Sequence, residues 1–308
     1  MKGPGEVQDV NEVNGVKDGS GGVAAFFDLD GTLVSLPSLE RRFFRTLRYR
    51  REIRIQNYFL WLKEAVRLAP RGFSAILQAN KMYLRGVEIF DERDERDGKV
   101  SSWHKDGHQA KGQASVLRSR KAQRHPRLPV PTFFAQAIDT VAWHVKQGHE
   151  IVVISGTLEP LARRAALALE TELAARGITV TIRVIATRLE EKEGRWTGRV
   201  LGEAMFGEAK ARAAKQLAIE LRLDLRRCYA YGDCLNDRWL MEMAGRPAAV
   251  NPSNDLASIA RTRGWPILSW EGKENITQRR PARVRTSAVN RDIAEKKEQQ
   301  DAIAGCKW

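Results

Sequence analysis

The sequence predicts an α/β fold in which a parallel β-sheet is flanked by helices. Short apolar runs rich in β-branched and aromatic residues occupy positions 23–27, 149–154 and 228–231, and segments with helical periodicity lie between them. Each run leads into acidic or hydroxyl side chains. Because open α/β sheets bind ligands at the carboxyl ends of their strands, we expect these side chains to form one site at that edge of the sheet.

The first run, at 23–27, leads into Asp28-Leu29-Asp30-Gly31-Thr32. Successive strand residues point to opposite faces, so a strand that continues here projects Asp28 and Asp30 into one small space. Two close carboxylates repel each other unless a cation neutralises them or one stays protonated. Such a pair suits a nucleophile and a proton donor. The alternative is a simple turn, because Asp and Gly are frequent turn residues.

The segment at 40–83 has apolar residues at helix-like spacing, which predicts helices inserted after the first strand. The segment that follows, at 91–129, is polar, rich in Lys, Arg and Gln, and has little periodicity. An extended basic insertion and a local corruption of the sequence both explain this pattern.

The second run, at 149–154, ends in Ser155-Gly156-Thr157, and residues 159–176 after it are rich in Ala, Leu and Arg with helical periodicity. This order places Ser155 at a strand-to-helix junction, where free backbone N–H groups attract anions. The alternative is that Ser155 or Thr157 is an ordinary N-cap.

The third run, at 228–231, leads into Gly232-Asp233-Cys234-Leu235-Asn236-Asp237. In isolation, helix capping is the simpler interpretation of Asp233 and Asp237. Upstream, Lys210 opens an Ala-rich helix predicted at 208–221, where a cation is unfavourable against the helix dipole. A purely structural role for Lys210 therefore explains its position poorly.

Weaker patterns predict the rest of the chain. Alternating, polar or apolar segments predict one strand, one hairpin and the last two strands of the sheet, at 178–186, 187–200, 248–252 and 265–268. Residues 1–22 lack periodicity and predict a flexible leader. Residues 273–308 have mixed charge and few apolar residues, which predicts a disordered tail.

These motifs, in this order, resemble those of the haloacid dehalogenase superfamily of phosphohydrolases, from about residue 23 to residue 270. The helical segment after the first motif and the wording of the fourth motif are similar to the phosphoserine-phosphatase-like branch, subfamily IB. The resemblance implies a Rossmann-like core at 23–36 and 130–272. It also implies a helical cap at 37–129, although relatives lack the irregular basic insertion that this chain carries there.

The resemblance implies a role for each acidic motif residue. Asp28 is expected to attack phosphorus and form an aspartyl-phosphate. Asp30 is expected to protonate the leaving alkoxide and then to activate the hydrolytic water. Asp28, Asp233 and the backbone carbonyl of Asp30 are expected to hold Mg²⁺. Ion-pumping relatives lack the second acid, so the presence of Asp30 implies turnover to free phosphate.

The resemblance also implies the groups that bind phosphate. Ser155, the Gly156 N–H and Lys210 are expected to contact the equatorial phosphoryl oxygens, where the charge of the transition state is spread. Asp237 is expected to orient Lys210 or a metal-bound water, and Asn236 to touch the substrate or such a water.

The formal net charge of the 308 residues is +14. Much of the positive charge lies at 41–54, 105–127 and 279–285. It fits steering of phosphorylated substrates, peripheral contact with an anionic membrane, nucleic-acid binding or a solvated surface. No recognisable nucleic-acid-binding module accompanies the charge, and a solvated surface is the simplest interpretation.

No apolar stretch reaches the length of a membrane span, and no apolar signal-peptide region follows Met1. Cys228, Cys234 and Cys306 are an odd number and form no disulfide framework. A reducing cytoplasm is therefore the expected compartment.

We expect a cytoplasmic Mg²⁺-dependent phosphatase that acts on a small phosphorylated metabolite or a lysophospholipid-like substrate. One alternative is a phosphomutase or phosphotransferase, which also keeps an acid like Asp30. Another is a basic membrane- or polyanion-binding protein with a vestigial phosphatase site, although every motif retains its reactive side chains. Neither the physiological substrate nor the oligomeric state follows from the sequence.

Overall fold

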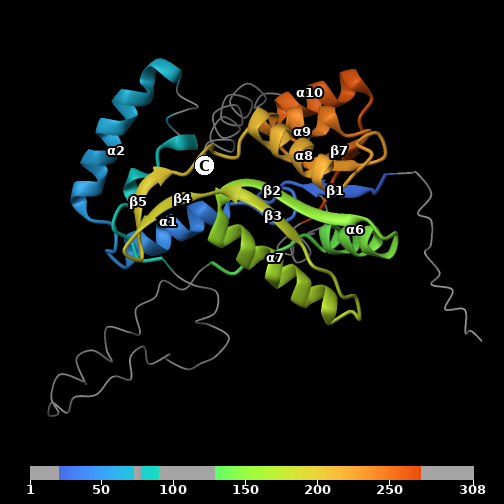
Figure 1. Cartoon of the computed structure of the whole chain (residues 1–308), viewed down its shortest axis with the longest axis horizontal. Coiled ribbons are helices and arrows are strands. Elements are labelled where there is room, and N and C mark those ends of the chain that lie inside the picture. The colour runs from blue at the N-terminus through green and yellow to red at the C-terminus, as the bar shows by residue number, and fades with distance from the viewer. Residues whose placement is uncertain (1–20, 73–75, 77, 90–128, 272–308) are drawn as a thin grey trace, which may run out of the picture.

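The computed structural model describes residues 21–72, 76, 78–89 and 129–271, arranged as Figure 1 shows. The main strands are β1 (Ala24–Phe27), β2 (Glu150–Leu158), β3 (Arg183–Thr187), β6 (Tyr229–Gly232), β7 (Arg246–Val250) and β8 (Ile267–Leu268). Within the described residues they form one parallel sheet in the order β3-β2-β1-β6-β7-β8. The predicted α/β fold is confirmed.

Helices cover both faces of this sheet. One face carries α8 (Glu208–Glu220), α9 (Arg238–Met243) and α10 (Asn254–Arg263), and the other carries α6 (Ala135–Lys146) and α7 (Glu159–Ala174), as Figure 1 shows. Side chains of β1 alternate between the faces: Ala24 and Phe26 pack under α8 to α10, whereas Ala25 and Phe27 pack under α6 and α7. All four are fully buried, as is typical of a central parallel strand.

A second group of elements lies at one end of the molecule (Figure 1). It contains α1 (Leu39–Tyr49), α2 (Ile55–Leu68), the short 3-10 helices η1 (Ala69–Arg71) and η2 (Met82–Leu84), and the hairpin of β4 (Leu189–Lys192) and β5 (Arg195–Val200). The hairpin joins the segment after η2, because Gly86 N donates to Trp196 O at 2.8 Å and Trp196 N donates to Val87 O at 3.1 Å.

The first of these helices, α1, is anchored to the core. Its N-cap is Ser38, whose side chain accepts a hydrogen bond from Arg41 N at 3.2 Å. Phe43 and Leu47 on its inner face are fully buried in the cluster that contains Phe27. The helix predicted for this segment is therefore confirmed, and its apolar side packs in the cluster that contains Phe27.

Three predicted boundaries differ from the structure. β1 ends at Phe27, so the alternation of strand residues does not orient Asp28 and Asp30. β2 continues to Leu158, and Ser155 therefore lies inside the strand, next to a break in its register with β3. β3 begins only at Arg183, because the N–H of Ile182 is bound by the Glu170 side chain at 2.7 Å instead of a neighbouring strand.

Several predictions concern residues that the structure does not describe. The predicted leader up to residue 20, residues 91–128 of the basic insertion and the predicted tail at 273–308 lie outside the described residues. The division of the chain into core and cap stays a prediction. Among the described helices, none is both long and apolar enough to cross a bilayer.

Candidate active site

The predicted motifs meet at the carboxyl edge of the sheet. Phe27, the last residue of β1, is in register with Val153 of β2 and with Tyr231 of β6. The chain then continues into Asp28, whose backbone N–H donates to Tyr231 O at 2.9 Å. Asp28 and Asp233 therefore leave adjacent parallel strands at the same edge, as the sequence predicts.

Lys210 joins two of the predicted acids. Its Nζ lies 2.5 Å from Asp28 Oδ1 and 2.6 Å from Asp237 Oδ1. The side chain of Lys210 is 3% exposed, and those of Asp28 and Asp237 are 7% and 0% exposed. Burial opposes the charged form of Lys210, yet Asp237 and Asp28 outweigh it and raise the pKa of the ammonium. Its ion pairs with Asp28 and Asp237 thus offset the unfavourable position of Lys210 at the start of α8.

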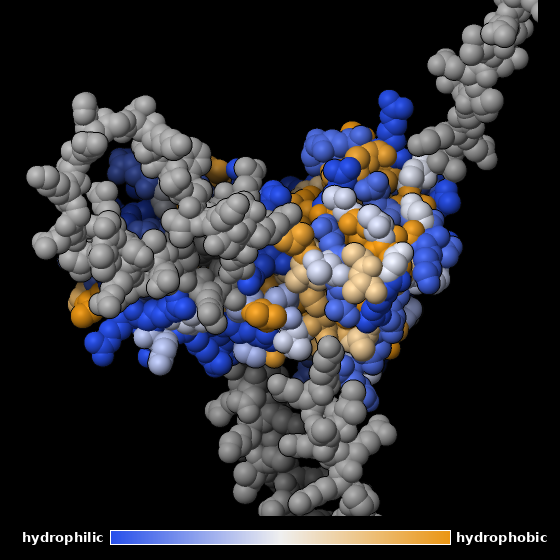
Figure 2. Space-filling view, turned by 90° about the horizontal axis from the view of Figure 1, so that it is seen from below, coloured by the Kyte–Doolittle hydropathy of each residue, from blue (hydrophilic) through white to orange (hydrophobic). Residues whose placement is uncertain are grey.

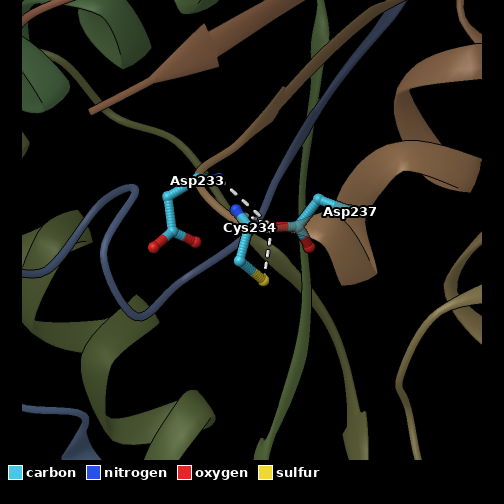
Figure 3. A group of neighbouring side chains, drawn as sticks. All are labelled: Asp233, Cys234 and Asp237. Carbon is cyan, nitrogen blue, oxygen red and sulfur yellow. Dashed lines mark hydrogen bonds between the residues drawn. The ribbon is translucent and has the colours of Figure 1, made fainter. Parts of the chain in front are cut away.

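Asp237 uses both of its carboxylate oxygens, as Figure 3 shows in part. Oδ1 binds Lys210, and Oδ2 accepts the backbone N–H groups of Asp233 and Cys234, each at 3.1 Å, and the Cys234 thiol at 3.4 Å. Asp237 therefore caps the turn η3 (Leu235–Asp237), as the capping interpretation states, and also holds Lys210. Its carboxylate is occupied by donors, which fits a residue that positions Lys210 rather than a metal ligand.

Asp30 lies at the start of α1. Its Oδ1 accepts the backbone N–H of Leu39, the first residue of that helix, at 2.7 Å. Burial raises the pKa of Asp30 to about 6, the Leu39 N–H opposes the rise, and the charge of Glu40 adds to it. Burial likewise raises the pKa of Asp28 to about 7, with Lys210 opposing the rise and Asp237 and Asp30 adding to it. The charge of Asp30 thus acts on Asp28 although no strand aligns the two acids.

Glycines allow close approach at two points of this site. Gly31 has φ +96°, and a Cβ added there would lie 2.1 Å from Asp233 Oδ2. The backbone of the loop that begins at Asp28 therefore touches the Asp233 carboxylate. A Cβ on Gly156 would lie 2.2 Å from the ring of Phe206, and the Gly156 carbonyl accepts the Thr187 hydroxyl at 2.8 Å.

Ser155 is 1% exposed, and its hydroxyl accepts the N–H of Thr157 at 3.2 Å. The N-cap of α7 is Leu158, which makes no side-chain capping bond, so the N-cap interpretation of Ser155 and Thr157 is wrong. Asn236 is half-buried in η3 and, in the described part of the chain, shares no side-chain hydrogen bond with the other predicted site residues.

A family model of haloacid dehalogenase-like hydrolases matches residues 25–242, well over half of the chain. The chain belongs to this family. The matched region contains each site residue described above, from Asp28 to Asp237. The family that the motifs predict is therefore confirmed.

Similar proteins agree with this membership. A Mycobacterium tuberculosis protein named Probable phosphatase Rv3661 is 36% identical over 152 residues, which are 49% of this chain and 49% of that protein. Phosphoserine phosphatase SerB1 of the same species is 37% identical over 124 residues, which are 40% of this chain and 37% of that protein. The chain thus spans about half the length, or less, of these two relatives.

Another relative and one solved structure match more of the chain. The Inhibition of morphological differentiation protein of Streptomyces azureus is 28% identical over 283 residues, covering 86% of this chain and 88% of that protein. A crystal structure of a protein with unknown function from Bordetella pertussis Tohama I has a TM-score of 0.52 at 24% identity and covers 81% of this chain and 99% of that one. That similarity supports the shared fold.

Two sets of side chains offer ligand atoms for a metal ion in this hydrolase. The side chains of Asp233, Cys234 and Asp237 lie together, with ligand atoms within 4.8 Å of one another. This set fits Mg²⁺ poorly, because a thiol is a soft ligand and the Asp237 carboxylate is already bound by Lys210 and three other donors. The oxygens of Asp28 and Asp233 fit it better, because the Gly31 contact brings Asp233 against the loop that carries Asp28.

A buried cluster of Glu40, Lys81 and Tyr83 lies beside the site and is not predicted by the sequence analysis. Glu40 accepts hydrogen bonds at Oε1 from Lys81 Nζ and Tyr83 OH, each at 2.5 Å. Lys81 is 2% exposed, and burial and the charge of Glu40 hold the pKa of Tyr83 well above its usual range. A signal was available, because Glu40 is the lone acid of α1 and precedes the buried Phe43 by one turn on the same face.

Proposed function

We propose that this hydrolase cleaves phosphate monoesters through an aspartyl-phosphate on Asp28, with Mg²⁺ as its cofactor. The observation that carries the proposal is the buried ammonium of Lys210, held 2.5 Å from Asp28 and 2.6 Å from Asp237. A fixed cation beside a buried carboxylate offers a phosphoryl group both an attacking oxygen and a partner for its negative charge.

In the first step, an Asp28 oxygen attacks phosphorus while the bond to the leaving oxygen breaks. Ser155, the Gly156 N–H and Lys210 bind the equatorial oxygens, where charge accumulates. Asp28 and Asp233, with the Asp30 carbonyl, would hold Mg²⁺, which lowers the repulsion between the anionic nucleophile and the anionic phosphate.

Asp30 is the proton donor of this step. Its Oδ1 accepts the Leu39 N–H, so the carboxyl proton is placed on Oδ2, the oxygen available to the leaving group. The raised pKa of Asp30, about 6, lets a larger share of the residue carry that proton near neutral pH than an exposed aspartate would. In the second step water attacks phosphorus, its proton returns to Asp30, the bond to Asp28 breaks and phosphate leaves.

The substrate is a small phosphorylated metabolite or a lysophospholipid-like ester, and a relative named phosphoserine phosphatase supports the first class. The test is Mg²⁺-dependent release of phosphate from p-nitrophenyl phosphate by the full chain, with loss in EDTA. Asp28→Asn is expected to abolish release. Asp139→Asn, the same change on the exposed side of α6, is the matched control and is expected to keep it.

Three results would contradict the proposal. Turnover by Asp28→Asn near the wild-type rate would exclude Asp28 as the nucleophile. Absence of Mg²⁺-dependent turnover in the wild type, with both this ester and a panel of phosphorylated metabolites, would favour the vestigial site. Transfer of the phosphoryl group to a second alcohol in preference to water would favour a phosphotransferase.

A further inference from the structure

A cavity of about 500 Å³ opens between α1 and α2. It begins beside the proposed proton donor: Leu39 N–H binds Asp30, and the next residue, Glu40, lines the cavity. The cavity therefore lies next to the first turn of α1, the turn whose backbone binds Asp30. Its lining residues are Glu40, Arg41, Phe44, Arg45, Arg48, Tyr58, Trp61 and Tyr83.

Among the described residues, the two buried charges at the floor of this cavity pair with each other. Glu40 is paired with Lys81 at 2.5 Å and also accepts the Tyr83 hydroxyl, so the acid and the ammonium offset each other. Phe44 meets Tyr83 edge to face at 5.2 Å, and Trp61 packs against the same apolar cluster. Such walls favour an apolar body, and the Glu40 carboxylate that lines them is already paired with Lys81.

One edge of the cavity is basic. Arg41, Arg45 and Arg48 follow one another at spacings of four and three residues, which places them along one side of α1. All three are exposed. The cavity therefore combines an aromatic interior with a cationic rim, the arrangement expected for an amphiphilic anion.

The outer face of α2 is apolar and exposed. Ile55, Phe59, Leu62 and Val66 recur at spacings of four, three and four residues and are 76%, 69%, 57% and 69% exposed. We call these four residues the α2 stripe. Phe59 and Leu62 directly follow Tyr58 and Trp61 in sequence, so the stripe adjoins the face of α2 that lines the cavity. The helix is fixed from its other side, where Asn57 donates to Tyr83 O and Arg85 O at 3.1 and 2.8 Å.

Basic residues predominate in the segment that forms α1 and α2. Residues 39–68 contain nine Arg or Lys and three Glu, a net charge of +6. Where side chains are coloured at the left end of Figure 2, the end at which Figure 1 places α1 and α2, most of them are hydrophilic. An exposed apolar helix face within a basic surface is the pattern of proteins that bind an anionic bilayer. A second copy of the chain fits less well, because it would bring two surfaces of charge +6 together.

We propose that α1 and α2 form an interfacial substrate site. The α2 stripe enters the surface of an anionic membrane, and the cavity takes the apolar body of a phosphate monoester drawn from that membrane. The cleaved substrate class is therefore a lipid phosphomonoester. This inference rests on the phosphatase activity proposed above, because the same Asp28 and Asp30 carry out the cleavage.

The test compares soluble and membrane-bound substrates with the full chain. The substrates are p-nitrophenyl phosphate, phosphoserine, and lysophosphatidate in vesicles of phosphatidylcholine with or without phosphatidylglycerol. The variant is Phe59→Glu/Leu62→Glu, which alters two exposed residues of the α2 stripe. Its control is Ile219→Glu, the same change at a residue of α8 that is 74% exposed.

The wild type is expected to sediment with vesicles that contain phosphatidylglycerol, less so at high salt, and to hydrolyse lysophosphatidate faster than phosphoserine. The stripe variant is expected to lose vesicle binding and at least about tenfold in kcat/KM for vesicle lysophosphatidate, because two apolar side chains no longer enter the bilayer. Its hydrolysis of p-nitrophenyl phosphate and the behaviour of Ile219→Glu are expected to match the wild type.

Three results would overturn the inference while the phosphatase activity stands. They are unchanged vesicle binding by the stripe variant, preference of the wild type for phosphoserine over lysophosphatidate, and a wild-type dimer that the stripe variant converts to a monomer. Failure of the proposed function is a separate result, because it removes hydrolysis of p-nitrophenyl phosphate by the wild type.

Discussion

Replacing Lys210 by Met keeps a long unbranched side chain but removes the ammonium between Asp28 and Asp237. Both carboxylates are almost fully buried and lie 2.5 and 2.6 Å from the Lys210 nitrogen. Removing one partner of a buried ion pair leaves uncompensated charge and costs about 3–5 kcal/mol of the free energy of unfolding. The phosphoryl group also loses its cation, so turnover is expected to fall by about a hundredfold or more.

The loss of stability in Lys210→Met is expected to depend on pH. Without the ammonium, the pKa of Asp28 rises further above its unfolded value, because Lys210 is the group that lowers it. A group with a raised folded pKa contributes stability at low pH that is lost as pH rises through that pKa. The deficit against wild type is therefore larger at pH 8 than at pH 6, where Asp28 can take a proton.

Urea unfolding at both pH values, in EDTA, measures this deficit, and p-nitrophenyl phosphate measures turnover. Lys215→Met is the matched control, because Lys215 is an exposed residue of the same helix. If Lys210→Met were as stable and as active as Lys215→Met, the buried ion pairs would play no part in the fold or in the reaction.

Three further perturbations test separate parts of the site and its support. Asp30→Asn keeps the acceptor for the Leu39 N–H but cannot donate a proton to the leaving group. Its kcat is expected to fall about a hundredfold or more for alkyl phosphates and less for p-nitrophenyl phosphate, whose leaving group needs less protonation. Equal losses of kcat for both substrates would contradict the role of Asp30. Gly31→Ala places a methyl group against Asp233 and is expected to raise the Mg²⁺ concentration needed for activity. The control is Gly177→Ala, which also has a positive φ but no neighbour within 4 Å of the added methyl group. This control is expected to leave the Mg²⁺ requirement unchanged. His144 is fully buried, and burial lowers its pKa from 6.5 to about 3. The free energy of unfolding is therefore expected to fall as pH drops below 6.5, by up to about 1.4 kcal/mol per pH unit. If urea unfolding of the wild type and of His144→Gln showed the same dependence on pH, His144 would not be its source.

The carboxyl edge of the sheet could be predicted because its signals are local. Each motif follows a buried apolar run, and parallel strands place their carboxyl ends side by side. The proximity of Asp28 and Asp233 could therefore be predicted without information on any tertiary contact. Lys210 could be predicted as a site residue because a cation at the start of a helix is unfavourable against the helix dipole unless acidic groups lie nearby. The structure supplies those groups in the carboxylates of Asp28 and Asp237.

The remaining features depend on contacts between distant segments. Glu40 and Lys81 are 41 residues apart, and no periodicity relates the segments that carry them. The two roles of Asp237 also could not be separated, because capping of a turn and binding of Lys210 require the same carboxylate in the same place. Strand alternation predicts one orientation for Asp30, whereas the structure fixes the side chain through the N–H of Leu39.

The central claim is that Asp28 carries the phosphoryl group during turnover. The most direct measurement is acid quenching of the Asp30→Asn variant during reaction with phosphate-labelled p-nitrophenyl phosphate, followed by mapping of the labelled peptide. The account predicts a label on Asp28 that exceeds that of the wild type, because hydrolysis of the intermediate is slowed, and no label in Asp28→Asn/Asp30→Asn. No label in Asp30→Asn, or a label on any other residue, would contradict it.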